Sequence, residues 1–115
     1  MSDTVRLAGI GLMGILLWTT VGLAVESRPT LVSGKELLRQ CAADRGICHG
    51  YVAAVADVMS SVGAIHGYAS CVPADVTVKQ HTRAVVKWME AHPDDLGFTA
   101  HSIVDEALSE TFPCK

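Results

Sequence analysis

Apolar residues recur at helical spacing along most of the chain after residue 32. The clearest stripe lies between residues 51 and 65, where they follow one another at alternating steps of four and three. Its members are Tyr51, Val55, Val58, Val62 and Ile65, and Val52 and Met59 widen it. Such spacing places them on one side of a helix, whereas no stretch alternates apolar and polar residues for long, as a half-buried strand would. The pattern predicts an all-α fold.

Capping signals and helix breakers divide this pattern into separate helices. The first opens with a capping box, in which the Ser33 hydroxyl accepts from the Glu36 amide and Glu36 reaches back. The Asp-Arg-Gly sequence at residues 44–46 interrupts the pattern, and a second, longer helix follows. Gly63 and Gly67 are expected to end that second helix.

A third and a fourth helix complete the prediction. Thr77 and Gln80 form another capping box, Pro93 stops the third helix, and the fourth is expected to begin near Asp94 and Asp95. The side chains expected to face the core are His81, Ala84, Val85 and Trp88, then Leu96, Ala100, Ile103, Val104, Ala107 and Leu108. Those expected to face outward are His101, Asp105, Glu106 and Glu110. Short connections between the helices predict a small up-down four-helix domain.

The chain begins with an apolar leader. Residues 7–24 carry no charge and end in Gly-Leu-Ala, which offers small residues at the two positions that a signal peptidase reads. We expect a signal peptide over residues 1–24, cleavage after Ala24, and a periplasmic protein. The alternative is an uncleaved membrane anchor, since eighteen residues are just long enough to span a bilayer. Residues 25–32 then form a loose lead-in, and residues 33–115 form the helical domain.

The four cysteines predict two disulfides, because an even number behind a leader is typical of an oxidising compartment. Cys41 ends the first predicted helix beside Cys48, which starts the second. The second helix separates Cys48 from Cys71 by about 27 Å, whereas the Cα atoms of a disulfide lie about 4.4 to 6.8 Å apart. Cys71 is instead expected near the end of the fourth helix, where Cys114 lies. Geometry favours the pairs Cys41–Cys48 and Cys71–Cys114. The alternative, Cys41–Cys114 with Cys48–Cys71, requires a sharp break near Gly63.

The sequence predicts no catalytic residue, no metal site and no cofactor. Cys48 and His49 point about 100° apart on a helix, and the paired cysteines leave no free thiol. The five histidines contain no pair at i, i+3 or i, i+4 spacing and no HExxH. Asp94 and Asp95 are expected to cap a helix rather than to form an acid pair. These observations indicate a protein that is not an enzyme.

Three polar positions receive a structural interpretation. His81 is expected to be partly buried and hydrogen-bonded to a neighbour, while His101 and Asp105 form a surface i, i+4 pair. Acidic residues exceed Lys and Arg by three, and no basic run appears. Nucleic-acid binding is therefore not expected.

Several spaced segments together resemble one protein family. They are Cys48-His49-Gly50-Tyr51, Cys71-Val72-Pro73, Val76-Thr77, Gln80, Val85-Val86, His92-Pro93, Ala107-Leu108 and Phe112-Pro113-Cys114. Over residues 33–114 they are similar to the Rap/Tai family, whose members are small periplasmic immunity proteins that protect bacteria against peptidoglycan amidases delivered by type VI secretion. The resemblance implies an all-helical, disulfide-bonded fold, homodimerisation, and inhibition by occluding the active-site cleft of an amidase effector. His81 stands where the family pattern has a larger apolar residue.

The resemblance transfers no binding residues, so these are predicted from the chain itself. The glycine-bounded segment of residues 63–70 is the candidate presented loop, with Ile65, His66 and Tyr68 as side chains that anchor in a cleft of the partner. The alternative is an ordinary connection whose glycines let the chain reach Cys71. Contact with a membrane is expected only if the leader is uncleaved. Alternative functions are a periplasmic stress chaperone and an orphan periplasmic binding protein of the same fold.

Overall fold

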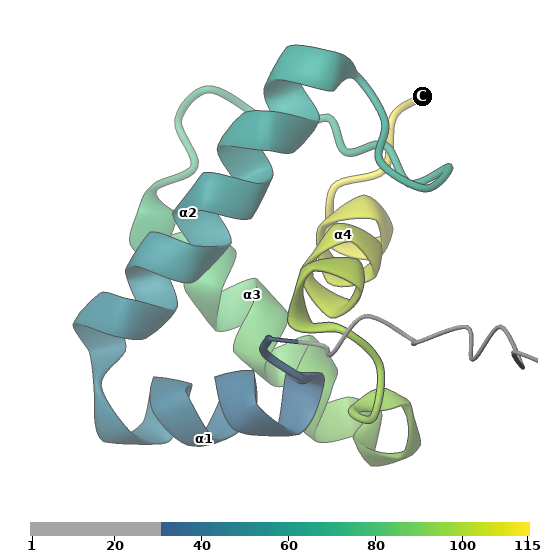
Figure 1. Cartoon of the computed structure of the whole chain (residues 1–115). Coiled ribbons are helices and arrows are strands. Elements are labelled where there is room, and N and C mark those ends of the chain that lie inside the picture. Colours follow the sequence, from purple (N-terminus) through teal and green to yellow (C-terminus); the bar gives the residue numbers. More distant parts are fainter. Residues whose placement is uncertain (1–30) are drawn as a thin grey trace, which may run out of the picture.

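The protein folds into four helices and one short 3₁₀ turn (Figure 1). The computed structural model describes residues 31–115. The elements are α1 (Gly34–Ala43), α2 (Arg45–Val62), α3 (Val78–Ala91), the 3₁₀ turn η1 (Pro93–Asp95) and α4 (Ala100–Thr111). The predicted all-α fold with four helices is confirmed. The expected signal peptide and most of the lead-in lie outside the described residues. Within residues 31–115, no helix combines the length and the apolar composition needed to cross a bilayer.

Helices α1 and α2 meet at a corner formed by Asp44 (Figure 1). The Asp44 Oδ1 accepts from the amide of Gly46 at 2.8 Å and from that of Ile47 at 3.4 Å. A disulfide between Cys41 and Cys48 spans the corner, with Cα atoms 4.7 Å apart. One aspartate therefore ends α1 and caps α2, while the disulfide holds the two helices together at their junction.

A second disulfide ties the loop after α2 to the C-terminal end of the chain. Cys71 pairs with Cys114, and the Cys71 amide also donates to the Phe112 carbonyl at 2.8 Å. The favoured pairing is confirmed, and the alternative pairing is wrong. The long loop between α2 and α3 consequently runs beside the end of α4 (Figure 1).

The two predicted capping boxes have different outcomes. Thr77 and Gln80 form both hydrogen bonds of the box at the start of α3. At the start of α1, Ser33 accepts from the Glu36 amide at 3.2 Å, as predicted. The Glu36 carboxylate, however, does not reach back. It accepts instead from the side chains of the residues three and four positions later, Arg39 and Gln40.

The start of the fourth helix was predicted too early. Asp94 and Asp95 belong to η1, and α4 begins only at Ala100. The residues between them pair with the start of α1, where the amides of Gly34 and Lys35 donate to the carbonyls of Phe98 and Leu96 at 2.9 Å each. Residues 96–99 form turns that these hydrogen bonds and the Ser33–Thr99 bridge hold against the start of α1, so the helix begins only after them.

A single core joins all four helices. Helix α3 packs against both α2 and α4, and α1 packs across them. The apolar residues at its centre are Leu37, Val52, Met59, Val85, Trp88, Met89, Leu96, Ala100, Ile103, Val104, Ala107 and Leu108. At its edge, the Trp88 indole N–H donates to the Glu110 carboxylate at 2.7 Å. The inward faces predicted for Val85 and Trp88 and for the apolar residues of α4 are confirmed.

The apolar stripe of α2 is only partly buried. Val52 and Met59 are buried, as predicted, whereas Val58 is 49% exposed and Val62 is 61% exposed. The predicted stripe spans a wider arc than the neighbouring helices cover, and the core lies on the side that carries Val52 and Met59. The expected burial of Val58 and Val62 is therefore wrong, and both side chains remain at the surface.

His81 is half-buried, as expected, but without the predicted hydrogen bond. Its Nε2 has no hydrogen-bond partner within residues 31–115. The ring instead packs edge-on against Phe112, with ring centroids 5.7 Å apart. Burial lowers the pKa of His81, which favours the neutral ring. The prediction of a polar partner is wrong because this side chain serves as an aromatic packing group.

Replacing each cysteine pair with alanine tests how much each disulfide contributes to the free energy of unfolding. In the chain-entropy model, closing the Cys71–Cys114 loop, of sequence separation 43, stabilises the fold by about 4 kcal/mol. The Cys41–Cys48 loop, of separation 7, contributes about 2.5 kcal/mol. We expect the Cys71→Ala/Cys114→Ala variant to lose more free energy of unfolding in urea than Cys41→Ala/Cys48→Ala. Equal losses, or the reverse order, would contradict this ranking.

Two helical glycines are expected to respond in opposite ways to alanine. A Cβ at Gly34 would lie 3.0 Å from the carbonyl oxygen of Leu96, whereas one at Gly50 would meet nothing within 4 Å. Gly50→Ala therefore raises the free energy of unfolding by about 0.5 to 1 kcal/mol through lower backbone entropy of the unfolded chain. Gly34→Ala lowers it, because the segment before α4 must shift. Thermal unfolding measures both, and a stabilised Gly34→Ala variant would disprove the close contact.

Candidate functional site

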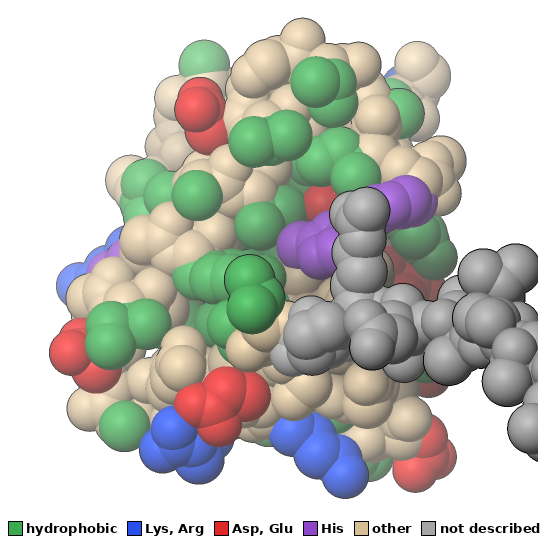
Figure 2. Space-filling view, in the orientation of Figure 1, with side chains coloured by type: hydrophobic (Ala, Val, Ile, Leu, Met, Phe, Trp, Pro, Cys, Tyr) green, Lys and Arg blue, Asp and Glu red, His purple; other side chains and the backbone are tan. Residues whose placement is uncertain are grey.

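A hollow of about 420 Å³ opens on the face where α2 lies beside α4. We call it the α2–α4 groove, lined by Tyr51, Ala54, Val55, Val58, Ile65, His66, His101 and Asp105. Figure 2 shows this face, with hydrophobic side chains along α2 and histidine side chains beside them. One helical turn beyond Val58, the exposed Val62 extends the apolar surface. The groove therefore combines apolar walls with a small group of titratable side chains.

A tight turn forms one end of the groove. Gly63, with φ 84°, ends α2 by donating its amide to the Met59 carbonyl. Ile65 and the residue three positions later, Tyr68, then exchange two backbone hydrogen bonds of 2.9 and 2.8 Å. Between them His66 has φ 51° and Gly67 has φ 85°, so both central residues adopt the positive φ of a type I′ turn.

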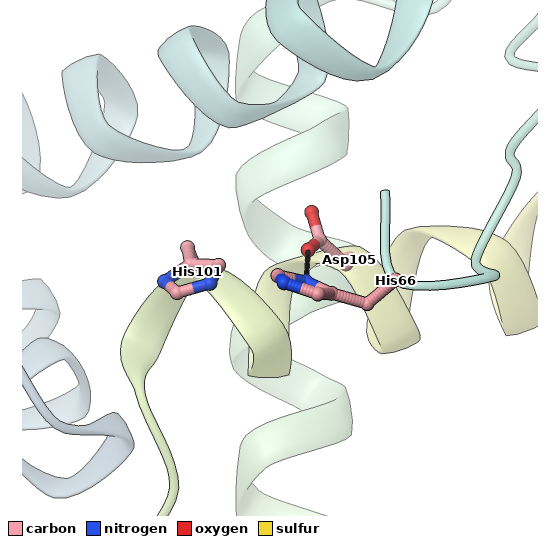
Figure 3. A group of neighbouring side chains, drawn as sticks. All are labelled: His66, His101 and Asp105. Atoms are coloured by element: carbon pink, nitrogen blue, oxygen red, sulfur yellow. Dashed lines mark ion pairs between the residues drawn. The ribbon is translucent and has the colours of Figure 1, made fainter. Parts of the chain in front are cut away.

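His66 is the unusual residue of this turn. It is the one non-glycine residue with a positive φ within residues 31–115, and that conformation costs a residue with a Cβ roughly 1 to 2 kcal/mol. The two backbone hydrogen bonds between Ile65 and Tyr68 hold it there. As a result, the imidazole projects from a fixed backbone position towards α4 (Figure 3).

Asp105 lies beneath this imidazole and is the most unusual side chain of the protein. It was predicted to face outward, and that prediction is wrong, since its side chain is 0% exposed. Neither carboxylate oxygen has a hydrogen-bond partner within residues 31–115. The His66 ring approaches this carboxylate most closely as an ion-pair partner within residues 31–115, with Nδ1 3.8 Å from Oδ2 (Figure 3), which is too far for a direct hydrogen bond. The turn after α2 covers Asp105, and the periodicity of α4 by itself carries no information about that turn.

Burial dominates the electrostatics of this cluster. It raises the pKa of Asp105, while the nearby His101 and His66 lower it in part. Burial also raises the pKa of Tyr51 on α2, and the Asp105 carboxylate adds to that effect. Desolvation disfavours a charge on either acid. An ionised Asp105 therefore lowers the stability of the folded state.

His101 completes a group of three neighbouring side chains. Its ring centroid lies 5.4 Å from that of His66, and one donor atom from each of His66, His101 and Asp105 lies within 4.8 Å of the other two. The i, i+4 relation of His101 and Asp105 is visible in the sequence, whereas His66 comes from a distant turn and has no sequence signal that joins it to them. Helix spacing alone gave no signal for the burial of Asp105, because the residue that covers it belongs to the turn after α2.

The three predicted binding residues do not share one surface. Ile65 and His66 line the α2–α4 groove, and the side chain of His66 is 63% exposed. Tyr68 is half-buried and packs against the core, so it anchors the turn instead of projecting from it. The role of all three in binding stays a prediction. Val58 and Val62, which the sequence analysis assigned to the core, are the apolar side chains that this face presents.

A second hollow, of about 490 Å³, lies along α3. Its lining includes Trp88 and His92, whose rings stack with centroids 3.9 Å apart. Here the polar groups are satisfied, since the His92 Nδ1 is hydrogen-bonded to the Trp88 carbonyl at 2.7 Å and the indole N–H is paired with Glu110. The α2–α4 groove is the better candidate site because it contains a buried acid without a partner.

Asp105→Asn is expected to stabilise the protein at neutral pH. Because the folded state raises the pKa of Asp105, this acid contributes stability below its unfolded pKa of about 3.9 and loses it as the pH rises through the folded pKa. Asparagine avoids that loss, with an expected gain of about 1 to 3 kcal/mol at pH 7 that shrinks towards pH 4. Urea unfolding in metal-free buffer at both pH values measures the difference.

Asp57→Asn is the matched control for this substitution. Asp57 is an exposed acid on α2, so its neutralisation should change the free energy of unfolding by less than about 0.5 kcal/mol at either pH. A loss of stability for Asp105→Asn at pH 7 would show that the carboxylate has a stabilising partner.

Comparison with protein families assigns the described helical domain to one family. The model of the Rap1a immunity proteins matches residues 33–114, from the N-cap of α1 to the last cysteine. No curated protein matches the chain. No solved structure matches it either. The family match includes all four helices, both disulfides and the α2–α4 groove. The chain therefore belongs to the Rap1a immunity protein family.

Proposed function

We propose that this protein is a periplasmic immunity protein that binds a peptidoglycan amidase effector of a type VI secretion system and blocks its active-site cleft. Membership of the Rap1a immunity proteins supports a role in protection against a protein effector. The amidase target follows from the resemblance to the Rap/Tai pattern of spaced cysteine, proline and aromatic residues. Protection of this kind is stoichiometric binding, so no catalytic group of this chain takes part.

The observation that carries the proposal is the exposed apolar surface of α2 beside a rigid turn. Val58 and Val62 stand at the surface on successive turns of a helix. Next to them, the hydrogen-bonded turn from Ile65 to Tyr68 projects the His66 side chain. Apolar side chains on rigid elements lose little entropy on binding, and specific complexes bury about 800 Å² on each partner. This face suits insertion into, or closure over, the cleft of an enzyme.

The proposed compartment agrees with the covalent structure. Both disulfides require an oxidising environment to form and persist. We propose that residues 1–24 are a signal peptide cleaved after Ala24, so that the lead-in of residues 25–32 and the helical domain of residues 33–115 form the mature protein. A peptidoglycan amidase acts in the same compartment, which places inhibitor and target together.

Homodimerisation is part of the same proposal. The family resemblance implies it. Because Val58 and Val62 are assigned to the effector, the two copies would meet on another face, which leaves the effector-binding surface open. Sedimentation of the wild type and of a Val58→Asp/Val62→Asp variant tests this. We expect a dimer for both proteins, and loss of the dimer in the variant would show that the second copy and the effector compete for one surface.

Two matched substitutions on α2 test the binding face. Val58 is 49% exposed at the groove, and Ile47 is 53% exposed at the other end of the same helix. We expect Val58→Asp to weaken effector binding by about 2 kcal/mol or more, roughly thirtyfold, because a charge replaces an apolar contact. Ile47→Asp should leave affinity within about twofold. The product of the adjoining gene is the candidate amidase for this test, in which calorimetry measures affinity and periplasmic co-expression measures rescue from host lysis.

The outcomes separate the proposed function from its alternatives. Equal weakening by both substitutions, with both variants folded by circular dichroism, would reject the α2 face as the binding site. Lysis that continues despite abundant folded protein would reject the immunity role against that amidase. It would favour an orphan binding role or a stress chaperone of the same fold.

A further inference from the structure

We propose that His66, His101 and Asp105 form a binding site for a late first-row divalent metal ion, with Zn²⁺ as the expected occupant. Two imidazole nitrogens and one carboxylate oxygen would supply the ligands (Figure 3). This inference is separate from effector binding and does not depend on it. It also differs from the sequence prediction of no metal site, which rested on spacing within single helices.

The distances of the cluster are close to those of a zinc site. Tetrahedral zinc with bonds of about 2.0 to 2.1 Å places its ligand atoms roughly 3.3 to 3.4 Å apart. The His66 Nδ1 and the Asp105 Oδ2 are 3.8 Å apart, and the donor atoms of all three residues lie within 4.8 Å of one another. Because the His66 side chain is 63% exposed, it is free to rotate over the short distance that remains.

Asp105 is the second and independent observation that points to a cation. Its side chain is wholly buried, yet neither oxygen has a hydrogen-bond partner in the described part of the chain. No lysine or arginine is among the described residues that line the groove, and the titratable groups there are Tyr51 from α2, His66 from the turn and His101 from α4. A buried carboxylate without a partner is costly, and a bound divalent ion would offset that cost.

The backbone of the turn indicates why a histidine stands at position 66. A glycine would adopt the positive φ of this position without strain, as Gly67 does next to it. A histidine at this position is more strained than glycine, but its ring lies next to the Asp105 carboxylate (Figure 3). Histidine is among the non-glycine residues that tolerate a positive φ, and a ligand role accounts for its presence here in place of glycine.

The donor set selects the kind of metal. Imidazole nitrogens suit Zn²⁺, Co²⁺, Ni²⁺ and Cu²⁺, whereas Mg²⁺ and Ca²⁺ prefer oxygen ligands alone. Three protein ligands would leave a fourth position of tetrahedral zinc open. The bound ion would fasten the turn after α2 to α4, so it should raise the melting temperature of the protein.

Titration of the purified chain with ZnCl₂ at pH 7.5 tests the site. We expect calorimetry to show one ion bound per chain, and saturating ZnCl₂ to raise the melting temperature. CoCl₂ should give visible absorption bands of a nitrogen- and oxygen-ligated ion, and MgCl₂ should give neither signal. Binding of Zn²⁺ should weaken in acidic buffer, because protons compete with a metal ion for its ligands.

Three variants assign the binding to the proposed residues. His66→Gly suits the positive φ of the turn, so it should fold at least as stably as the wild type without metal and yet bind Zn²⁺ at least about tenfold more weakly. His101→Ala should weaken binding to a similar extent. His49→Ala is the control, since this histidine lies near the start of α2, outside the cluster, and should leave affinity unchanged.

Two results would overturn the proposal. One is the absence of binding to the wild-type chain at Zn²⁺ concentrations up to about 100 μM. That concentration lies well above the dissociation constant expected for three protein ligands. The other is equal binding by the wild type and His66→Gly, which would assign the ion to other surface groups. Neither measurement involves the effector, so failure here leaves the immunity proposal untouched.

Discussion

The disulfide between Cys71 and Cys114 is the constraint on which the candidate site depends. It fastens the loop after α2 to the end of α4, and the hydrogen bond from the Cys71 amide to the Phe112 carbonyl supports the same contact. With the far end of the loop tied down, the turn after α2 lies against α4 and His66 comes to rest over Asp105. A small domain with a modest core depends on such links for its stability as well.

The α2–α4 groove reverses the usual distribution of polar and apolar side chains. Asp105 is buried without a partner, while Val58 and Val62 are exposed on the neighbouring helix. The core is apolar, and the Trp88 indole N–H at its edge is satisfied, although the His81 Nε2 is also buried without a partner within residues 31–115. Proteins break these rules mainly where function requires it. The same face thus carries both the proposed effector contact and the proposed metal site, which are separable by experiment.

Local signals in the sequence determined most of the fold. The capping residues Ser33 and Thr77 start α1 and α3 where predicted, because a cap depends on residues a few positions away. The pairing of Cys41 with Cys48 follows from a short separation across a predicted corner. The family pattern over residues 33–114 was recognisable for a related reason, since it consists of spaced cysteine, proline and aromatic positions.

Only the tertiary structure decided which faces of these helices are covered. Helical spacing defines a stripe on α2 but not where its neighbours end, so Val58 and Val62 were wrongly assigned to the core. Asp105 was wrongly placed at the surface for the converse reason, because a turn some forty residues earlier in the chain lies over it. Periodicity reports the direction of a side chain from its own helix axis. Its burial depends on what packs there, and that is set by long-range links such as Cys71–Cys114.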